Sequence, residues 1–133
     1  MTQVERILTS SRTVVVLGAR DKRHKAGFYV GEYLFERGYH VIGVNPRLAG
    51  RSLWSGPVRA TLDEIAEPVD LLDVFRRPED LPGHLDAMIA LRPKVVWFQL
   101  GIRHDAVAGA LEAAGIEVVQ DRCTLADHQM LGL

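Results

Sequence analysis

Short apolar runs alternate along this chain with longer segments whose apolar residues recur at helical spacing. The first run, residues 13–17, is rich in valine and ends at Gly18. A continuous apolar run of this length is typical of a strand that is buried on both faces of a parallel sheet. The next segment, 27–37, has the pattern of a helix and ends at Gly38, a residue type that commonly terminates helices.

The same alternation continues to the end of the chain. It predicts further strands at 39–44, 69–74, 94–98 and 116–119, and further helices at 4–8, 79–91, 104–114 and from 124 onward. We expect an irregular crossover at 48–60, and a capping box at 61–64 that opens a short helix. Strands that alternate with helices form a parallel sheet with right-handed crossovers. The pattern therefore predicts an α/β fold with a five-stranded, mostly parallel sheet.

Composition narrows the class of protein. A chain of 133 residues is expected to form a single domain, 1–133, and its 47% apolar and 25% charged residues are typical of globular proteins. The net charge of −1 argues against nucleic-acid binding, and no apolar run approaches the roughly 20 residues of a membrane span. The first residues lack a signal-peptide layout, and one cysteine cannot form an internal disulfide. We therefore expect a cytoplasmic protein.

In open α/β sheets, ligands bind outside the carboxyl ends of the strands. The predicted ends are Gly18-Ala19-Arg20, Val44-Asn45-Pro46-Arg47, Phe75-Arg76-Arg77 and Gln99-Leu100-Gly101. They contain no Ser-His-Asp order, no paired carboxylates and no metal-binding cluster. Their cationic and hydrogen-bonding side chains are suited to holding an anion rather than to transforming one.

The loop 18–26 adds positive charge beside the first strand. It contains Arg20, Lys22, Arg23, His24 and Lys25. The start of the helix that follows has free N–H groups and a positive dipole end, which favour a phosphate. We expect one or two of these cations to contact a ligand and the others to be solvated, as most charge runs are.

The strand ends do not match the usual dinucleotide pattern. That pattern has a second glycine at the position of Arg20 and an acid at the end of the second strand, where this chain has Asn45-Pro46-Arg47. NAD is therefore disfavoured. An arginine at this position suits a ribose phosphate, so NADP and other phosphorylated adenosines remain open.

Five strings of this sequence resemble the small stand-alone CoA-binding proteins, whose domain is similar to the N-terminal CoA-binding domain of the succinyl-CoA synthetase α subunit. The strings are residues 16–19, 39–46, 69–78, 95–103 and 121–123, and they follow the family's order over nearly the whole chain. The resemblance implies a Rossmann-like three-layer fold that binds coenzyme A or an acyl-CoA.

The resemblance also implies a role for each strand end. Gly18, Ala19 and Arg20 would cradle the pyrophosphate through their backbone N–H groups, with a loop cation such as Lys25 adding charge. The adenosine would lie along Val44, Asn45, Pro46 and Arg47, with Arg47 near the 3′-phosphate. The pantetheine arm would be lined by Phe75, Arg76, Phe98 and Gln99, although Phe98 can equally be a core residue of a buried strand.

Ligase catalysis does not carry over, because the synthetase places its phosphohistidine in a second domain with no counterpart among these residues. We therefore predict a non-catalytic CoA-binding protein. An NADP-dependent or acyl-CoA-using enzyme is the alternative, and a structural or regulatory protein with an empty cleft is a weaker one. A homodimer or an unknown protein partner is possible, and Trp54 is either a loop anchor or a dimer contact.

Cys123 follows the last predicted strand and has two interpretations. Most single cysteines are inert core thiols. A mixed disulfide with the thiol of CoA is the sharper hypothesis, because the adjacent Arg122 would favour the thiolate.

Overall fold

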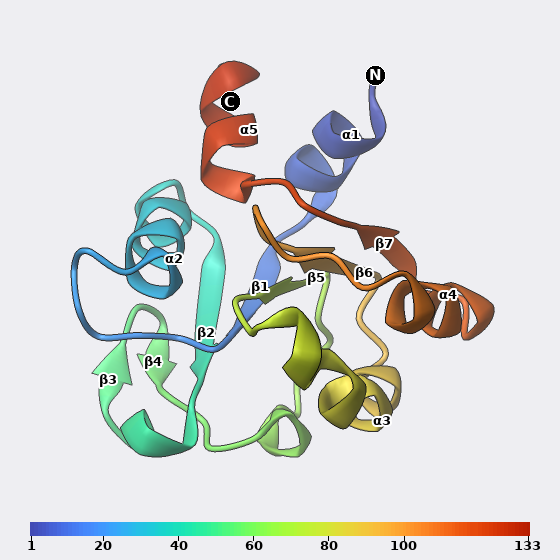
Figure 1. The fold of residues 1–133 in the computed structure, drawn as a ribbon. Helices are drawn as coiled ribbons and strands as arrows, with labels where there is room; N and C mark the ends of the chain where they lie inside the picture. The colour runs from blue at the N-terminus through green and yellow to red at the C-terminus, as the bar shows by residue number, and fades with distance from the viewer.

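The computed structural model describes residues 1–133 and has the expected α/β architecture (Figure 1). The elements, with η for 3₁₀-helices, are α1 (Gln3–Ser10), β1 (Thr13–Leu17), α2 (Ala26–Glu36), β2 (His40–Val44), η1 (Pro46–Leu48), β3 (Ser52–Leu53), β4 (Gly56–Pro57), η2 (Leu62–Glu64), β5 (Leu71–Val74), η3 (Pro78–Asp80), α3 (Leu81–Leu91), β6 (Val95–Phe98), α4 (Asp105–Ala113), β7 (Glu117–Val119) and α5 (Thr124–Met130). Five parallel strands form the main sheet in the order β2-β1-β5-β6-β7. The predicted Rossmann-like fold is confirmed.

Helices cover both faces of the sheet. α1, α2 and α5 lie on one face, and α3 and α4 lie on the other (Figure 1). Successive strand residues point to opposite faces, so Val14 packs under the first group of helices and Val15 under the second. Because both faces are buried, the strands are apolar at nearly every position, which explains why their sequence shows runs rather than alternation.

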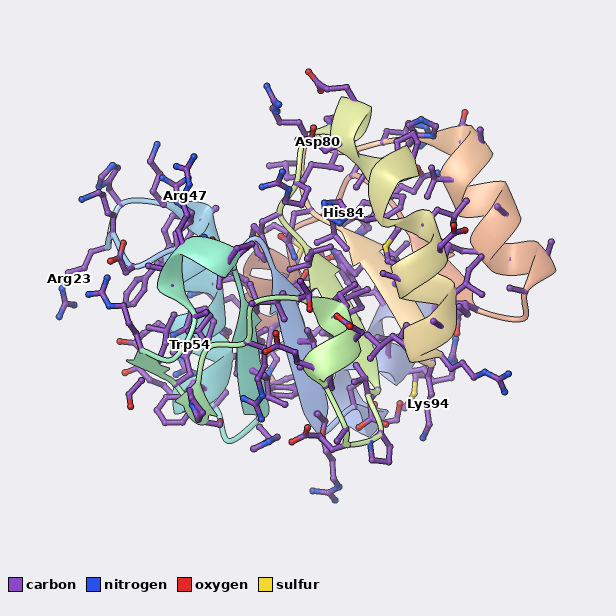
Figure 2. The ribbon with its side chains drawn as sticks, turned by 90° about the horizontal axis from the view of Figure 1, so that it is seen from below. Arg23, Arg47, Trp54, Asp80, His84 and Lys94 are labelled. Atoms are coloured by element: carbon purple, nitrogen blue, oxygen red, sulfur yellow. The ribbon has the colours of Figure 1, made fainter.

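The segment 48–60 is not irregular as predicted, because it contains the antiparallel hairpin β3-β4. Trp54 lies at the hairpin turn (Figure 2). Its indole packs into a notch formed by two glycines. A Cβ built on Gly31 of α2 would lie 2.5 Å from the indole ring, and one on Gly43 of β2 would lie 3.3 Å from it. Trp54 therefore anchors the hairpin to the domain, which supports the first of its two interpretations.

Two predicted helix starts differ from the structure. The predicted helix 79–91 begins with the 3₁₀ turn η3, and α3 itself starts at Leu81. At 61–64 the predicted capping box is absent, because the Thr61 hydroxyl donates to Asp63 and caps no backbone amide, and Glu64 does not accept the amide of Thr61. Glu64 instead accepts the amide of Ala60, at 3.2 Å. The resulting element is the short 3₁₀-helix η2.

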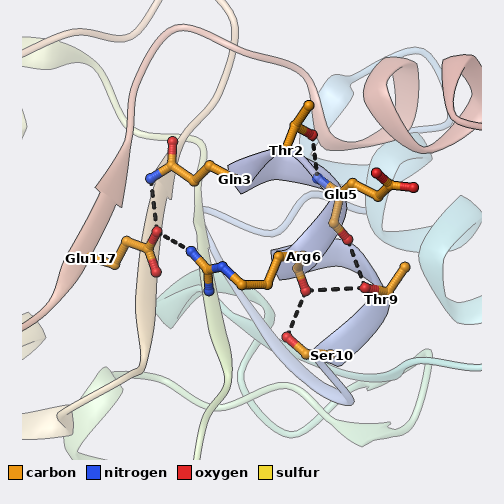
Figure 3. Close-up of polar contacts among 7 residues, drawn as sticks. All are labelled: Thr2, Gln3, Glu5, Arg6, Thr9, Ser10 and Glu117. Atoms are coloured by element: carbon orange, nitrogen blue, oxygen red, sulfur yellow. Dashed lines mark hydrogen bonds and ion pairs between the residues drawn. The ribbon is translucent and has the colours of Figure 1, made fainter.

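Polar contacts stabilise α1 at its N-terminus and along one side (Figure 3). The Thr2 side chain accepts the amide of Glu5 at 3.1 Å and so caps α1. Gln3 donates to the Glu117 carboxylate at 2.8 Å, and Arg6 forms an ion pair with the same group. These contacts join α1 to β7. None of the helices combines the length and the apolar character that crossing a lipid bilayer requires.

Candidate functional site

The order of the strands reverses between β1 and β5. From β1 the chain moves outward to β2, and the later strands extend from the opposite side. Such a switch point leaves a crevice at the carboxyl ends of the two central strands. Gly18 ends β1 there with φ +90°, and a Cβ at this position would lie 2.8 Å from the Phe75 carbonyl oxygen. Only glycine combines this backbone conformation with such close approach to the next strand.

Two depressions meet at Gly18, and together they span the carboxyl edge of the sheet. The first has a volume of about 370 Å³, and its lining includes Asn45, Pro46, Thr61, Asp63, Arg76 and His84. The second has a volume of about 360 Å³, and its lining includes Arg20, Lys25, Gly27, Phe75, Gln99 and Cys123. Each is about the size that a portion of a nucleotide-containing ligand requires.

The N-terminus of α2 borders the second depression and has no cap. Lys25 stands at the capping position without a side-chain hydrogen bond, and no acidic residue lies in the first turn. The backbone N–H groups of Ala26 and Gly27 have no acceptor in the protein. Free amides at the positive end of a helix dipole form a site for an anion such as phosphate.

The backbone amides of the turn 18–20 are already engaged, which corrects the prediction that they hold the pyrophosphate. Gly18 and Ala19 both donate to the Val44 carbonyl oxygen, at 3.0 and 3.2 Å. Arg20 donates to the Gly27 carbonyl oxygen at 3.2 Å. The Ala19 side chain is fully buried. The turn thus shapes the crevice, while the free amides belong to the start of α2.

The predicted cations surround this region on the surface. Arg20, Lys22, Arg23, His24, Lys25 and Arg47 are all exposed. The Arg47 guanidinium makes no hydrogen bond or ion pair, whereas Arg51 pairs with Asp21 at 3.0 Å. Figure 2 shows Arg23 and Arg47 projecting from the same end of the molecule. Exposed cations without partners are available to a phosphorylated ligand.

Asn45 joins the end of β2 to the turn after β1. Its Nδ2 donates to the Ala19 carbonyl oxygen at 2.7 Å, and its Oδ1 accepts the Arg47 amide at 2.9 Å. Both polar atoms of the side chain therefore have partners within the protein. Its contribution is to fix Pro46, which begins η1, in the lining of the first depression; the adjacent Arg47 lines neither depression and projects from the surface beside it.

The two adjacent arginines after β5 diverge, as expected of neighbours at a strand end. Arg76 lines the first depression, whereas Arg77 does not. Both pair with Asp80, at 3.4 and 3.0 Å. Burial, together with the nearby Arg76 charge, lowers the pKa of His84 in the same depression. The imidazole is therefore neutral at pH 7 and offers a hydrogen bond rather than a charge.

The residues predicted to line the pantetheine side fall into two groups. Phe75 is half-buried and lines the second depression together with Gln99. Phe98 is completely buried in the core beneath α3 and α4 and lines neither depression. Its assignment to the ligand side is therefore replaced by a core role. Cys123, which is half-buried, lines the second depression.

Sequence reasoning missed a buried acid beside the site. Asp73 of β5 is 0% exposed, and its carboxylate accepts hydrogen bonds from Gln99 and from Thr124, the latter at 3.0 Å. Burial raises the pKa of Asp73 to about 7, against the opposing effect of the two hydrogen bonds. The available signal was an acid within an otherwise apolar strand that is buried on both faces.

Comparisons with known proteins agree with this architecture. A family model described as a CoA binding domain matches residues 12–129. An uncharacterized protein of Bacillus subtilis (strain 168), YneT, is 30% identical over 126 residues, which cover 95% of this chain and 92% of that protein. The solved structure of ID.343 from Thermus thermophilus is 44% identical with a TM-score of 0.95, covering 98% of this chain and 99% of that one.

A larger enzyme shares the fold over part of its length. This enzyme is an acetyl-coenzyme A synthetase of Ca. Korarchaeum cryptofilum. Its structure matches 87% of this chain with a TM-score of 0.72 and 16% identity, and the match covers 27% of the enzyme.

Proposed function

Because the chain belongs to the family of CoA-binding domains, we propose that it binds coenzyme A or an acyl-CoA across the two depressions that meet at Gly18. The observation that carries the proposal is the uncapped start of α2, where two free amides adjoin the crevice and a loop of exposed cations. An anion placed there would gain amide hydrogen bonds and charge compensation together.

The pyrophosphate of CoA fits the start of α2, with Arg20 or Lys25 beside it. The adenosine would occupy the first depression along Pro46, and Arg47 would reach its 3′-phosphate. The pantetheine arm would follow the second depression toward Gln99 and Cys123. In this arrangement the protein holds the ligand, and we propose a binding role without catalysis of its own.

Isothermal titration of the purified protein with CoA, NADP and NAD tests this function. We expect saturable binding of CoA and no heat of binding from either dinucleotide. Binding of NADP without CoA would instead favour a reductase, because an arginine at the end of β2 also suits a ribose phosphate. A protein that responds to none of the three ligands would contradict the proposal.

Substitution of Arg47→Ala is expected to weaken binding of CoA about ten-fold or more, the order expected when a hydrogen bond between charged groups is lost. Binding of dephospho-CoA, which lacks the 3′-phosphate, should change by less than two-fold. Titration of both ligands measures the difference. Arg77→Ala is the matched control, because this arginine is likewise exposed but its guanidinium is paired with Asp80 at 3.0 Å. Equal losses for both ligands would remove the assignment of Arg47 to the 3′-phosphate.

A further inference from the structure

Three buried polar side chains form a hydrogen-bonded ring next to the second depression. They are Asp73 of β5, Gln99 after β6 and Thr124 at the start of α5, with exposed fractions of 0%, 4% and 0%. Gln99 belongs both to this ring and to the lining of the depression. The ring therefore connects the core of the sheet to the wall of the candidate site.

When Asp73 is ionised, the chemistry of the ring allows only one orientation of the Gln99 amide. An ionised carboxylate accepts hydrogen bonds and cannot donate them. The Gln99 Nε2 donates to Asp73 and also to the Thr124 Oγ1, at 2.9 Å. The Thr124 hydroxyl then donates to the second carboxylate oxygen, at 3.0 Å. With its NH₂ group held in the ring, the amide must direct its carbonyl oxygen away from Asp73.

That carbonyl oxygen is free. The Gln99 Oε1 accepts no hydrogen bond within the protein, and Trp54 Nε1 is the only buried side-chain polar atom without a partner. The Gln99 Oε1 must therefore reach the surface, and the surface that Gln99 lines is the second depression. An oriented acceptor in a partly apolar depression is suited to a ligand with an N–H donor, such as the secondary amides of a pantetheine arm.

We propose that Asp73 is a positioning residue that, through Gln99, turns an acceptor toward an amide N–H of the pantetheine arm. This inference rests on the proposed binding of CoA and assigns a recognition element to its amide-bearing arm. An acid at position 73 has a specific purpose here. Asparagine would offer one donor and one acceptor, so either orientation of the Gln99 amide could satisfy it, whereas a carboxylate permits only one.

Protonation of Asp73 would also remove this restriction, because the protonated carboxyl group gains a donor. The other titratable groups on the surrounding elements are Lys25, Tyr29, Glu32, Tyr33 and Glu36 of the α2 segment and Arg122, Cys123, Asp127 and His128 of the α5 segment. The register neighbours Val16 and Trp97 are apolar. His128 is engaged with the Tyr33 hydroxyl at 2.7 Å. Only burial and the two ring hydrogen bonds shift the pKa of Asp73. CoA binding should therefore strengthen as Asp73 ionises.

Two ligands separate the pantetheine contact from the rest of the site. CoA carries the arm, and adenosine 3′,5′-bisphosphate lacks it but retains adenosine and the 3′-phosphate. We expect Gln99→Met to weaken CoA about five-fold, the order of one neutral hydrogen bond, while the bisphosphate changes by less than two-fold. Bisphosphate binding also shows that each variant is folded. Adding Asp73→Asn to Gln99→Met should weaken CoA no further, because the two residues act through one contact.

The pH profile supplies a readout that a merely structural role would not change. The 5′-phosphate of the bisphosphate itself titrates at about pH 6, so the two proteins are compared at each pH. Between pH 6 and pH 8 the ratio of the dissociation constant of CoA to that of the bisphosphate should fall a few-fold further in the natural protein than in Asp73→Asn. Equal losses of both ligands, additive losses in the double variant, or an equal fall of this ratio in both proteins would overturn the inference. If the natural protein binds neither ligand, the proposed function fails; if it binds both and the variants behave alike, only this inference fails.

Discussion

Replacing Asp73 with asparagine is expected to stabilise the protein at alkaline pH. The free energy of unfolding of Asp73→Asn, measured relative to that of the natural protein, should rise by roughly 3 kcal/mol between pH 5 and pH 8. Burial raises the pKa of Asp73 from 3.8 to about 7 in the folded protein. Between these values the folded protein retains a proton that the unfolded chain has lost, so its stability falls as the pH rises toward 7. Asparagine does not titrate and avoids this loss.

Urea unfolding of both proteins at pH 5, 6, 7 and 8 measures the effect. Asp70→Asn is the matched control, because Asp70 is ionised in both the folded and the unfolded protein from pH 5 to pH 8, so its effect should stay nearly constant across this window. Although burial alone would raise it, the pKa of Asp70 is lowered by hydrogen bonds from the amides of Thr13 and Arg12 and by Lys94. Removing the Asp70 carboxylate should therefore destabilise the protein at pH 8. A difference between Asp73→Asn and the natural protein that stays constant from pH 5 to pH 8 would show that Asp73 does not titrate in this window.

The loss of stability that accompanies ionisation of Asp73 is relevant to function. An ionised Asp73 costs the folded protein stability at neutral pH, although the same strand positions elsewhere in the sheet are filled by apolar residues. Residues that break the local rules of a buried strand occur most often at functional sites. The one polar side chain that Asp73 holds at the edge of a depression is Gln99. The stability cost and the orientation of Gln99 are thus two consequences of the same carboxylate.

The main sheet could be predicted because its strands are buried on both faces and their sequence is continuously apolar. β1 was placed at 13–17, where it lies. The hairpin β3-β4 could not be predicted, since strands of two residues carry no periodicity and its stability depends on Trp54 filling a notch between distant glycines. The sequence of a segment indicates the conformation that this segment prefers by itself. The Trp54 contact joins three separate segments, α2, β2 and the hairpin, so no one of them predicts it.

Some features of the candidate site could likewise be predicted from the sequence, and others could not. The strand ends were identified because the carboxyl edge of a parallel sheet is fixed by topology. The assignment of Phe98 to the site was wrong because consecutive strand residues face opposite sides, and the sequence does not say which side adjoins the ligand. The engagement of the amides of Gly18 and Ala19 depends on β2 lying beside β1, a pairing that brings the Val44 carbonyl oxygen to both donors.

The second large effect on the free energy of unfolding is expected from substitutions at the contact between Trp54 and Gly31. Gly31→Ala should destabilise the natural protein by about 1–2 kcal/mol, because overpacking outweighs the helix preference of alanine. The new Cβ would lie 2.5 Å from the Trp54 ring. Trp54→Ala alone should cost about 3 kcal/mol or more, through the cavity that it leaves. In the Trp54→Ala background, Gly31→Ala should instead stabilise the protein by up to about 1 kcal/mol, since the ring is gone and only the helix preference remains.

Urea unfolding of the two single variants and the double variant measures this reversal of sign as a coupling energy. Gly109→Ala provides the control, because Gly109 is exposed in α4 and a Cβ there would meet no atom within 4 Å. It should stabilise both backgrounds equally through helix preference alone. An identical cost for Gly31→Ala with and without the indole would show that Trp54 does not occupy the notch. The hairpin would then be held beside β2 by its backbone hydrogen bonds, from Ser55 to Val41 at 3.1 Å and from Arg59 to Gly43 at 2.9 Å.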